Sequence, residues 1–484
     1  MFESTALGRR KLKDAPAPAA RALLSSADAR VLERPAVYDL HAAHVNPIFT
    51  RLVGLMGLDQ LFVRGSGAWI WDADGNRYLD FFGGFGCVNL GHYHPALLAR
   101  LREFLIDEHP VVFQTVGNRY AAALAANLAK VTPGALEVTF LCSTGSEATE
   151  GALKLARKAT GREAIVYAEQ AYHGCTMGAL SVTGYSRMRD PFAPLVPRCI
   201  SLPFGDAEAL EARLRRRDVA AFIVEPIQGH AGVIVPAAGY LKECARICRR
   251  YGTLLVLDEV QTCLGRTGTM FACEHDGVEP DVLTVGKSLG AGLVPLAAYI
   301  TTRAIWKRAY GSWEDFALHT STFGGNALGA ALGLATLETI DQEGLLARAR
   351  DVGAYLFDRL GELKAKHSII REVRGRGLMV GVELAPRSGG WGEHIAGAML
   401  ELVSERLVTN VFLSRLVNEH RVVIGASQTD RHVFRIYPPL VATREQIDTF
   451  VEAFDRVCTE LPNGTAILRR VAAGAARALA GKEQ

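Results

Sequence analysis

The chain has 484 residues, of which 49% are hydrophobic and 22% charged, a composition typical of a folded globular protein and not of a disordered or fibrous one. Its 54 basic and 51 acidic side chains leave a formal net charge of +3, too small over this length to indicate a nucleic-acid partner. No apolar run reaches the roughly 20 residues of a membrane helix, because charged residues and glycine interrupt every candidate.

The beginning of the chain, residues 1–34, mixes basic and acidic side chains and has no uninterrupted apolar core, so it does not resemble a secretory signal. Nine cysteines are present without a Cys-x-x-Cys pair. Cys244 and Cys248 lie one helical turn apart, which favours packing over metal ligation when no second pair is near. We therefore expect reduced thiols, no metal site and a cytoplasmic location.

Residues 1–90 are predicted to form an N-terminal arm and part of a small domain. Two aromatic runs, Ala68 to Trp71 and Tyr78 to Phe82, flank the turn-forming segment Asp72-Ala-Asp-Gly75. Short strand-like runs on either side of such a turn predict a β-hairpin.

Residues 91–335 alternate short apolar runs with helix-like stretches. Continuous apolar strands between helices predict a mostly parallel sheet covered on both faces, in a large α/β domain. The predicted strands are Val138 to Leu141, Ala164 to Tyr167, Ala221 to Val224, Leu254 to Leu257 and Val282 to Val285. The predicted helices include Glu147 to Thr160 and Gly239 to Arg250.

Residues 336–465 predict a smaller α+β domain. A helix-like run, Leu345 to Lys366, precedes the strand-like runs Leu378 to Glu383 and Val433 to Ile436. A further helix is expected from Thr443. The remaining residues, 466–484, are alanine-rich and basic, and we expect a peripheral tail there.

The turn after the first of the large-domain strands is rich in small residues. In an open α/β sheet, ligands bind at the carboxyl ends of the strands. The strand ending at Leu141 is followed by Cys142-Ser-Thr-Gly-Ser-Glu-Ala148, where backbone N–H groups of the helix start and the Ser146 hydroxyl can hold a phosphate. The alternative is that Ser143 or Thr144 only caps the helix.

Two charged side chains follow the last two predicted strands. Asp258 comes directly after Leu257, and a buried carboxylate there needs a cationic partner. Lys287 follows Val285 amid glycines, where burial would lower its pKa and make the amine a nucleophile; the alternative is an ordinary surface lysine. A phosphate site, a carboxylate and an amine are the three contacts that pyridoxal phosphate requires, and they point to amino-group transfer without a metal.

Ten motifs, between about residues 60 and 460, occur in the order in which they occur in one enzyme family. The motifs are Leu90-Gly-His-Tyr-His-Pro95, Ser143-Thr-Gly-Ser-Glu-Ala148, Tyr172-His-Gly174, Val224-Glu-Pro-Ile-Gln-Gly229, Leu257-Asp-Glu-Val-Gln261, Gly265-Arg-Thr-Gly268, Gly286-Lys287, Thr322-Phe-Gly-Gly-Asn326, Val373-Arg-Gly-Arg-Gly377 and Arg435-Ile-Tyr-Pro-Pro439. The chain thus resembles a class III (omega-type) aminotransferase of pyridoxal-phosphate fold type I. The resemblance implies a seven-stranded type of sheet, mostly parallel, in the large domain.

The resemblance assigns catalytic roles to two residues. Lys287 would attach the cofactor covalently and then move a proton between the substrate carbon and the cofactor. Asp258 would keep the pyridine nitrogen protonated. Gln261 would hydrogen-bond the ring hydroxyl, and Tyr172 would stack on one face of the ring.

The resemblance also assigns residues that hold the cofactor in place. Gly145 and Ser146 would bind the phosphate, and His173 and Glu225 belong to motifs of the cofactor site. Thr322 would reach the phosphate of the neighbouring subunit. The implied assembly is a homodimer with shared active sites, and the sequence leaves open whether dimers pair into tetramers.

One arginine is the candidate for holding the substrate carboxylate. The family uses the arginine of the Arg-x-x-Pro-Pro motif, here Arg435, in bidentate fashion; the alternative is a structural ion pair. In ornithine-type members a glutamate follows Gln-Gly and pairs with this arginine. Here that position is His230, which puts in doubt a switch in which a carboxylate masks Arg435.

Other differences bear on the substrate pocket. Within Gly84-Phe-Gly-Cys87, Gly86 stands where some omega-transaminases have tryptophan, so we expect a wider pocket that includes Phe85 and Cys87. Met270 to His275 and Leu318 to Thr322 are most similar to putrescine-type diamine aminotransferases. These features favour a primary amine or omega-amino compound as donor and an α-keto acid as acceptor, or the reverse reaction on the aldehyde or ketone.

Two other activities are considered. A mutase or racemase of the same family would keep the same cofactor contacts. Gly286-Lys-Ser-Leu-Gly290 also matches the Gly-x-Ser-x-Gly pattern of a serine hydrolase with Ser288 as nucleophile. That pattern needs a helix directly after the serine, and the sequence from Gly290 to Pro295 breaks any helix.

Overall fold

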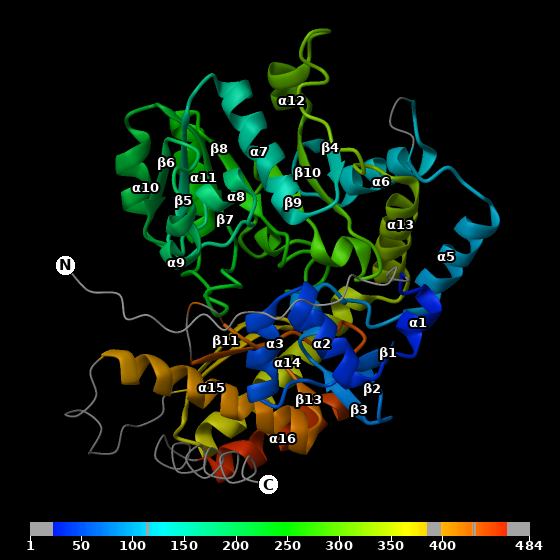
Figure 1. The fold of residues 1–484 in the computed structure, drawn as a ribbon. Helices are drawn as coiled ribbons and strands as arrows, with labels where there is room; N and C mark the ends of the chain where they lie inside the picture. The colour runs from blue at the N-terminus through cyan, green and yellow to red at the C-terminus, as the bar shows by residue number, and fades with distance from the viewer. Residues whose placement is uncertain (1–22, 113–115, 385–397, 428, 430–431, 462–484) are drawn as a thin grey trace, which may run out of the picture.

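The computed structural model describes residues 23–112, 116–384, 398–427, 429 and 432–461. The predicted tail, residues 466–484, and the first residues of the predicted N-terminal arm lie outside this range. Figure 1 shows an upper lobe that contains the seven-stranded sheet and a lower lobe that contains the N-terminal and C-terminal elements. The division at residues 90 and 335 stays a prediction.

The strands of the upper lobe form one mixed, mostly parallel sheet in the order β4-β10-β9-β8-β7-β5-β6. They are β4 Leu136–Cys142, β5 Ala164–Ala168, β6 Cys199–Leu202, β7 Val219–Val224, β8 Leu254–Asp258, β9 Val282–Val285 and β10 Ala297–Thr302. β10 is antiparallel to both of its neighbours, and the pairs from β9 to β6 are parallel. The carboxyl ends of all the strands except β10 therefore lie on one edge of the sheet, which confirms the predicted fold class.

Helices cover the sheet, as the continuous apolar strands predicted. Every residue of β7 and β8 is buried. Figure 1 shows the covering helices around the sheet; they include α6 Arg119–Val131, α7 Gly145–Thr160, α10 Ala207–Leu214, α11 Tyr240–Tyr251, α12 Arg303–Tyr310 and α13 Ala327–Gln342. Helix α7 begins after Thr144, whose hydroxyl accepts the Glu147 N–H, and ends at Gly161 with a φ of 67°, a conformation that glycine adopts without steric cost.

The lower lobe joins the two ends of the described chain. The predicted hairpin is confirmed, with β2 (Trp69–Asp72) antiparallel to β3 (Arg77–Asp80). Strand β13 (Val422–Val423) pairs in parallel with β3, so residues more than 300 positions apart share one sheet with β1 (Phe62–Ser66).

A second four-stranded sheet in the lower lobe carries the candidate substrate arginine. Its order is β11-β12-β15-β14, with bounds β11 Ile370–Arg376, β12 Met379–Leu384, β14 Gly425–Ala426 and β15 Val433–Ile436. Helix α14 (Leu345–Lys366) has the predicted bounds, and α16 (Arg444–Glu460) starts directly after Thr443, where a helix was expected. Thr443 and Gln446 form a capping box at the start of α16, which satisfies backbone donors of its first turn.

The remaining described helices connect these layers. They are α1 Ser26–Arg30, α2 Arg34–His44, α3 Pro47–Leu55, α4 Gly83–Gly86, α5 Pro95–Ile106, α8 Met177–Ser181, α9 Ser186–Arg189 and α15 Ala398–His420. None of the helices in the described part of the chain combines the length and apolar character that a membrane span needs.

Candidate active site

A cavity of about 320 Å³ opens at the carboxyl edge of the seven-stranded sheet. Turns after five of its strands contribute Thr144, Gly145, Ser146, Tyr172, His173, Gly174, Glu225, His230, Asp258, Val260, Gln261 and Lys287 to the lining, and Gly84, Phe85, Cys87, Met188 and Arg435 complete it. The structure thus brings together all of the site residues predicted from the sequence except Gly86 and Thr322.

Gly86 and Thr322 lie outside this lining. A Cβ at Gly86 would make ordinary contacts, 3.7 Å from Arg266 Nε and 3.8 Å from Tyr437 Cδ2, but the φ of 82° at this position would strain a tryptophan. Thr322 is exposed in the segment between α12 and α13. Its predicted contact with a neighbouring subunit stays a prediction.

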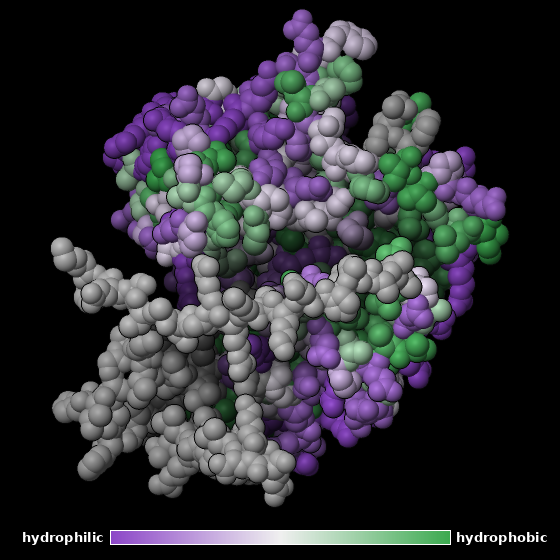
Figure 2. Space-filling view, in the orientation of Figure 1, coloured by the Kyte–Doolittle hydropathy of each residue, from purple (hydrophilic) through white to green (hydrophobic). Residues whose placement is uncertain are grey.

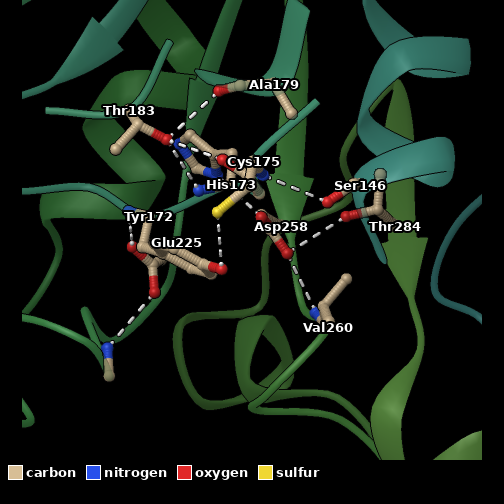
Figure 3. Close-up of polar contacts among 12 residues, drawn as sticks. Ser146, Tyr172, His173, Cys175, Ala179, Thr183, Glu225, Asp258, Val260 and Thr284 are labelled. Atoms are coloured by element: carbon tan, nitrogen blue, oxygen red, sulfur yellow. Dashed lines mark hydrogen bonds and ion pairs between the residues drawn. The ribbon is translucent and has the colours of Figure 1, made fainter. Parts of the chain in front are cut away.

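Asp258 is held in place at the end of β8 by three hydrogen bonds (Figure 3). His173 Nδ1 lies 2.6 Å from its Oδ2, while the Val260 N–H (3.0 Å) and the Thr284 hydroxyl (3.2 Å) donate to its Oδ1. Burial by itself would raise the pKa of Asp258, but the hydrogen bond and charge of His173, the Val260 N–H and the charge of Lys287 outweigh it and lower the pKa. The buried carboxylate therefore stays ionised.

Lys287 follows β9 with a half-buried side chain, and its amine lies near Asp258, Cys87 and Glu225. Burial lowers its pKa and Arg435 adds to this, while Asp258, Cys87 and Glu225 partly oppose the shift. Among the described residues the amine has no hydrogen bond or ion pair. A φ of 43° at Lys287 is a strained conformation for a side chain of this size. The amine thus combines a lowered pKa with the absence of a protein partner among the described residues, as a nucleophile requires.

The segment after Lys287 does not form a nucleophile elbow. Lys287 to Gly290 make a single 3₁₀ turn that ends at Ala291 in the left-handed region, and Ser288 is buried outside the cavity lining. Because an α-helix does not follow the serine, the geometry required of a serine hydrolase is missing from this described segment.

The start of α7 offers hydrogen-bond donors to an anion. Thr144 caps the helix, as the alternative interpretation proposed. The N–H groups of Gly145 and Ser146 nevertheless donate to no acceptor among the described residues, and both residues line the cavity. Free N–H groups at the positive end of a 16-residue helix are a suitable phosphate site.

The Tyr172 ring stacks on an imidazole of the same chain. Its centroid lies 4.5 Å from that of His230, with 14° between the ring planes. Burial, together with the charges of Arg435 and Lys287, lowers the pKa of His230 to about 4, so the imidazole is neutral near pH 7. His230 Nε2 is buried without a hydrogen-bond partner within the described residues. One face of Tyr172 is therefore taken by His230, and only the other face is left for a ligand.

Gln261 is fixed in the cavity lining by two contacts. Its Nε2 donates to the Phe85 carbonyl (2.9 Å), and its Oε1 accepts from the Tyr437 hydroxyl (3.4 Å). The predicted role for Gln261, binding a ring hydroxyl, stays a prediction.

Arg435 extends from β15 to the cavity and is only 2% exposed. Its guanidinium carbon lies 5.6 Å and 5.4 Å from the ring centroids of Phe82 and Phe85. Among the described residues no carboxylate pairs with it, and its Nε has no hydrogen-bond partner. The alternative of a structural ion pair is therefore not supported within the described chain, and the guanidinium can accept a carboxylate.

Some contributors to the site were not predicted. Met188 enters the lining from the short helix α9, Thr284 supports Asp258, and Phe82 packs on Arg435. The sequence places Thr284 on the strand next to the one that carries Asp258. Predicting their contact would also have required the register of β8 and β9. Met188 and Phe82 belong to no motif.

The residues of this cavity fit pyridoxal phosphate. A buried carboxylate with a lowered pKa, an unpaired amine and two free N–H groups at a helix start correspond to the pyridine nitrogen, the aldehyde and the phosphate. The described residues contain no group of three or more potential metal ligands.

Comparisons with known proteins agree in placing this chain among aminotransferases. A family model described as aminotransferase class-III matches residues 57–458. The aminotransferase PigE of Serratia sp. (strain ATCC 39006) is 37% identical over 471 residues, which are 90% of this chain and 55% of PigE. The chain thus spans about half the length of this curated relative.

Solved structures resemble the described fold over most of its length. Ornithine aminotransferase from Toxoplasma gondii superposes with a TM-score of 0.78 at 30% identity, covering 89% of this chain and 96% of that chain. An (S)-enantioselective omega-transaminase from Thermomicrobium roseum superposes with a TM-score of 0.78 at 30% identity, and the match covers 89% of this chain and 99% of that chain. A second structure of the T. gondii enzyme has partial occupancy of PLP at its active site. It superposes with a TM-score of 0.77 at 30% identity, and the match covers 88% of this chain and 94% of that chain.

Proposed function

The chain belongs to the class III aminotransferases, pyridoxal-phosphate enzymes that transfer amino groups. From this premise we propose that it moves an amino group between a primary amine or omega-amino compound and an α-keto acid. The observation that carries the proposal is that Lys287 and Asp258 line one cavity together with the free N–H groups at the start of α7.

The cofactor would be held by three groups of this chain. Lys287 would attach it, the Gly145 and Ser146 N–H groups would bind its phosphate, and Asp258 would face its ring nitrogen. Bound there, pyridoxal phosphate supplies an electron sink that makes a C–H bond next to the substrate nitrogen acidic.

The residues themselves handle the charge and the proton. Asp258 stays negative because His173 and two further donors stabilise its ionised form, so it can keep a positive charge opposite it. The Lys287 Nζ, whose pKa is lowered by burial, can take a proton from the substrate carbon and return it to another position.

Arg435 would bind the carboxylate of the keto acid. A buried guanidinium without a protein carboxylate is a strong site for a bidentate anion. His230, which the sequence places where ornithine-type enzymes have glutamate, is neutral near pH 7 and cannot mask Arg435 as a carboxylate would. We expect Arg435 to be available to substrate in both halves of the reaction.

We predict that Arg435→Gln raises the KM for the α-keto acid about 10- to 100-fold, the range expected when a charge-assisted bidentate contact is lost. The KM of an amine donor without a carboxylate should change less than about threefold, because it makes no such contact. Steady-state kinetics with each substrate varied in turn would measure this. Arg371→Gln, on an exposed position of β11 that pairs with Glu383, is the control. Equal effects on both substrates would contradict the assignment.

The reaction type is tested by supplying an amine donor and an α-keto acid together. We expect the holoenzyme to form the aldehyde or ketone of the donor and the amino acid of the acceptor in equal amounts, as measured by mass spectrometry. Putrescine, other diamines and simple primary amines form the donor panel, since the putrescine-like segments favour such donors. A mutase or racemase would change one substrate alone and would produce no transaminated acceptor.

We also propose a homodimer and a cytoplasmic location. Large apolar side chains are exposed on the segment that contains Thr322, among them Trp313, Phe316, Leu318 and Phe323. Figure 2 shows another apolar area over the side of the molecule occupied by α5, where Leu105 and Ile106 are exposed. Such patches support an interface between subunits. All nine cysteines are free, which supports a reducing compartment.

A further inference from the structure

One buried carboxylate links the two loops that carry the stacked rings. Glu225 follows β7 and is 6% exposed. Its Oε1 accepts the Tyr172 N–H (3.0 Å; Figure 3), and its Oε2 accepts the Gly229 N–H (3.2 Å). Gly229 directly precedes His230, so each oxygen of Glu225 holds the backbone at or next to one ring of the pair.

The loop at Gly229 has little room to move in compensation. A Cβ at Gly229 would lie 1.7 Å from Gln261 Oε1, so the backbone there is already in close contact with the Gln261 side chain. The geometry of the Tyr172 and His230 rings therefore depends on where Glu225 holds the two loops.

A second bond links the same two loops but lies outside the cavity lining. Gln228 Nε2 donates to the Glu169 carbonyl at 2.7 Å, and neither residue lines the cavity. Gln228 is as deeply buried as Glu225 but carries no charge. A substitution of Gln228 therefore serves as the matched control for Glu225, because it removes a bond between the same two loops without removing a charge.

The charge of Glu225 changes near neutral pH. Burial and the charge of Asp258 raise its pKa to about 7, although His173 and the two backbone donors oppose the shift. The other titratable groups that face it are Lys287, Tyr172 and Tyr437. As pH falls through about 7, the carboxyl gains a proton on one oxygen. That oxygen becomes a hydroxyl and is a weaker acceptor for the backbone N–H that it faces.

We propose that Glu225 is a positioning residue that holds the Tyr172–His230 ring pair against the cavity, and that protonation of Glu225 loosens this pair. Its effect on catalysis rests on the proposed aminotransferase function, but its effect on the rings does not. The ionised form keeps both backbone bonds, whereas protonation weakens the bond to one of the two loops, so the ring pair is held less firmly in the protonated form.

The ring geometry is measured by NMR on the full, cofactor-loaded chain labelled with ¹³C in the histidine rings. The His230 signal is identified by its loss in His230→Gln. Because the pKa of His230 itself is lowered to about 4, a shift of this signal near pH 7 reports a neighbour and not its own protonation. We expect such a shift in the wild type and in Gln228→Met. In Glu225→Gln the signal should show no transition there.

Two results of the NMR measurement would overturn the proposal. One is a His230 signal that does not change near pH 7 in the wild type. The other is the same transition in Glu225→Gln as in the wild type, since the responding group would then be another one. Both readings are independent of any turnover, so a protein without aminotransferase activity would contradict the proposed function and leave this test intact.

The effect on catalysis is measured with a double-mutant cycle. At pH 8, Glu225→Gln should lower kcat/KM for the keto acid about 3- to 10-fold, as expected for one or two weakened hydrogen bonds. In a His230→Ala background, where the ring pair is already absent, the same substitution should cost less than about twofold. An equal loss in both backgrounds would show that Glu225 does not act through the rings.

Discussion

Lys287→Ala is expected to abolish covalent attachment of the cofactor and to lower kcat at least about a thousandfold. The substitution removes both the amine that bonds the aldehyde and the base that moves the substrate proton, and a positioned general acid–base alone contributes about 10²- to 10⁴-fold. The Gly145 and Ser146 donors remain. The variant should therefore bind pyridoxal phosphate reversibly and lose its visible absorbance on gel filtration.

The control for this variant is Lys242→Ala, on an exposed position of α11. It removes one lysine without touching the cavity, and both attachment and turnover should match the wild type. If Lys287→Ala retained the cofactor after gel filtration and denaturation, another amine would have to be the point of attachment.

Asp258→Asn is expected to leave the cofactor bound but to lower kcat about 10²- to 10³-fold. The substitution removes the negative charge that stabilises a protonated ring nitrogen, and loss of one such preorganised electrostatic contact has effects of this size. Lys287 and the phosphate donors are unchanged, so binding survives. Absorbance spectroscopy of the isolated variant would measure cofactor content, and single-turnover kinetics with an amine donor would measure the chemical step.

Glu259→Gln is the matched control, because Glu259 is the adjacent carboxylate and points away from the cavity. It accepts hydrogen bonds from the Thr262 hydroxyl and from the N–H groups of Ala272 and Cys273, and it is fully buried. The amide variant should keep turnover. It should lower thermal stability, because the new side-chain NH₂ group would face the N–H and O–H groups that now donate to Glu259. A catalytic loss equal to that of Asp258→Asn would contradict the role given to Asp258.

The upper-lobe fold was predictable where local patterns determine it. The run Leu254 to Leu257 is apolar throughout because β8 is covered on both faces, and the strand spans Leu254–Asp258. Helix α13 and strand β10 were not predicted. Eleven of the 16 residues of α13 are buried, so the helix is apolar over most of its surface and lacks the periodicity of a surface helix. Strand β10 runs antiparallel to its neighbours β4 and β9, and this direction is set by the pairing with them and not by the local sequence.

The site was predictable to the extent that parallel strands bring their ends together. Asp258 and Lys287 follow neighbouring strands, so their meeting at one edge required only the strand pattern. The support of Asp258 by Thr284 required the register that aligns these two residues. The stacking of Tyr172 on His230 required the conformation of two loops, which neither periodicity nor composition encodes.

The attachment of the cofactor to Lys287 is the central claim, and peptide mapping after borohydride treatment tests it most directly. Borohydride converts a reversible bond between an aldehyde and an amine into a stable secondary amine, which survives proteolysis and mass spectrometry. We expect the added mass of the reduced cofactor on the peptide that contains Lys287 and on no other. A modified peptide that contains a different lysine, or none at all from a cofactor-saturated protein, would contradict the account.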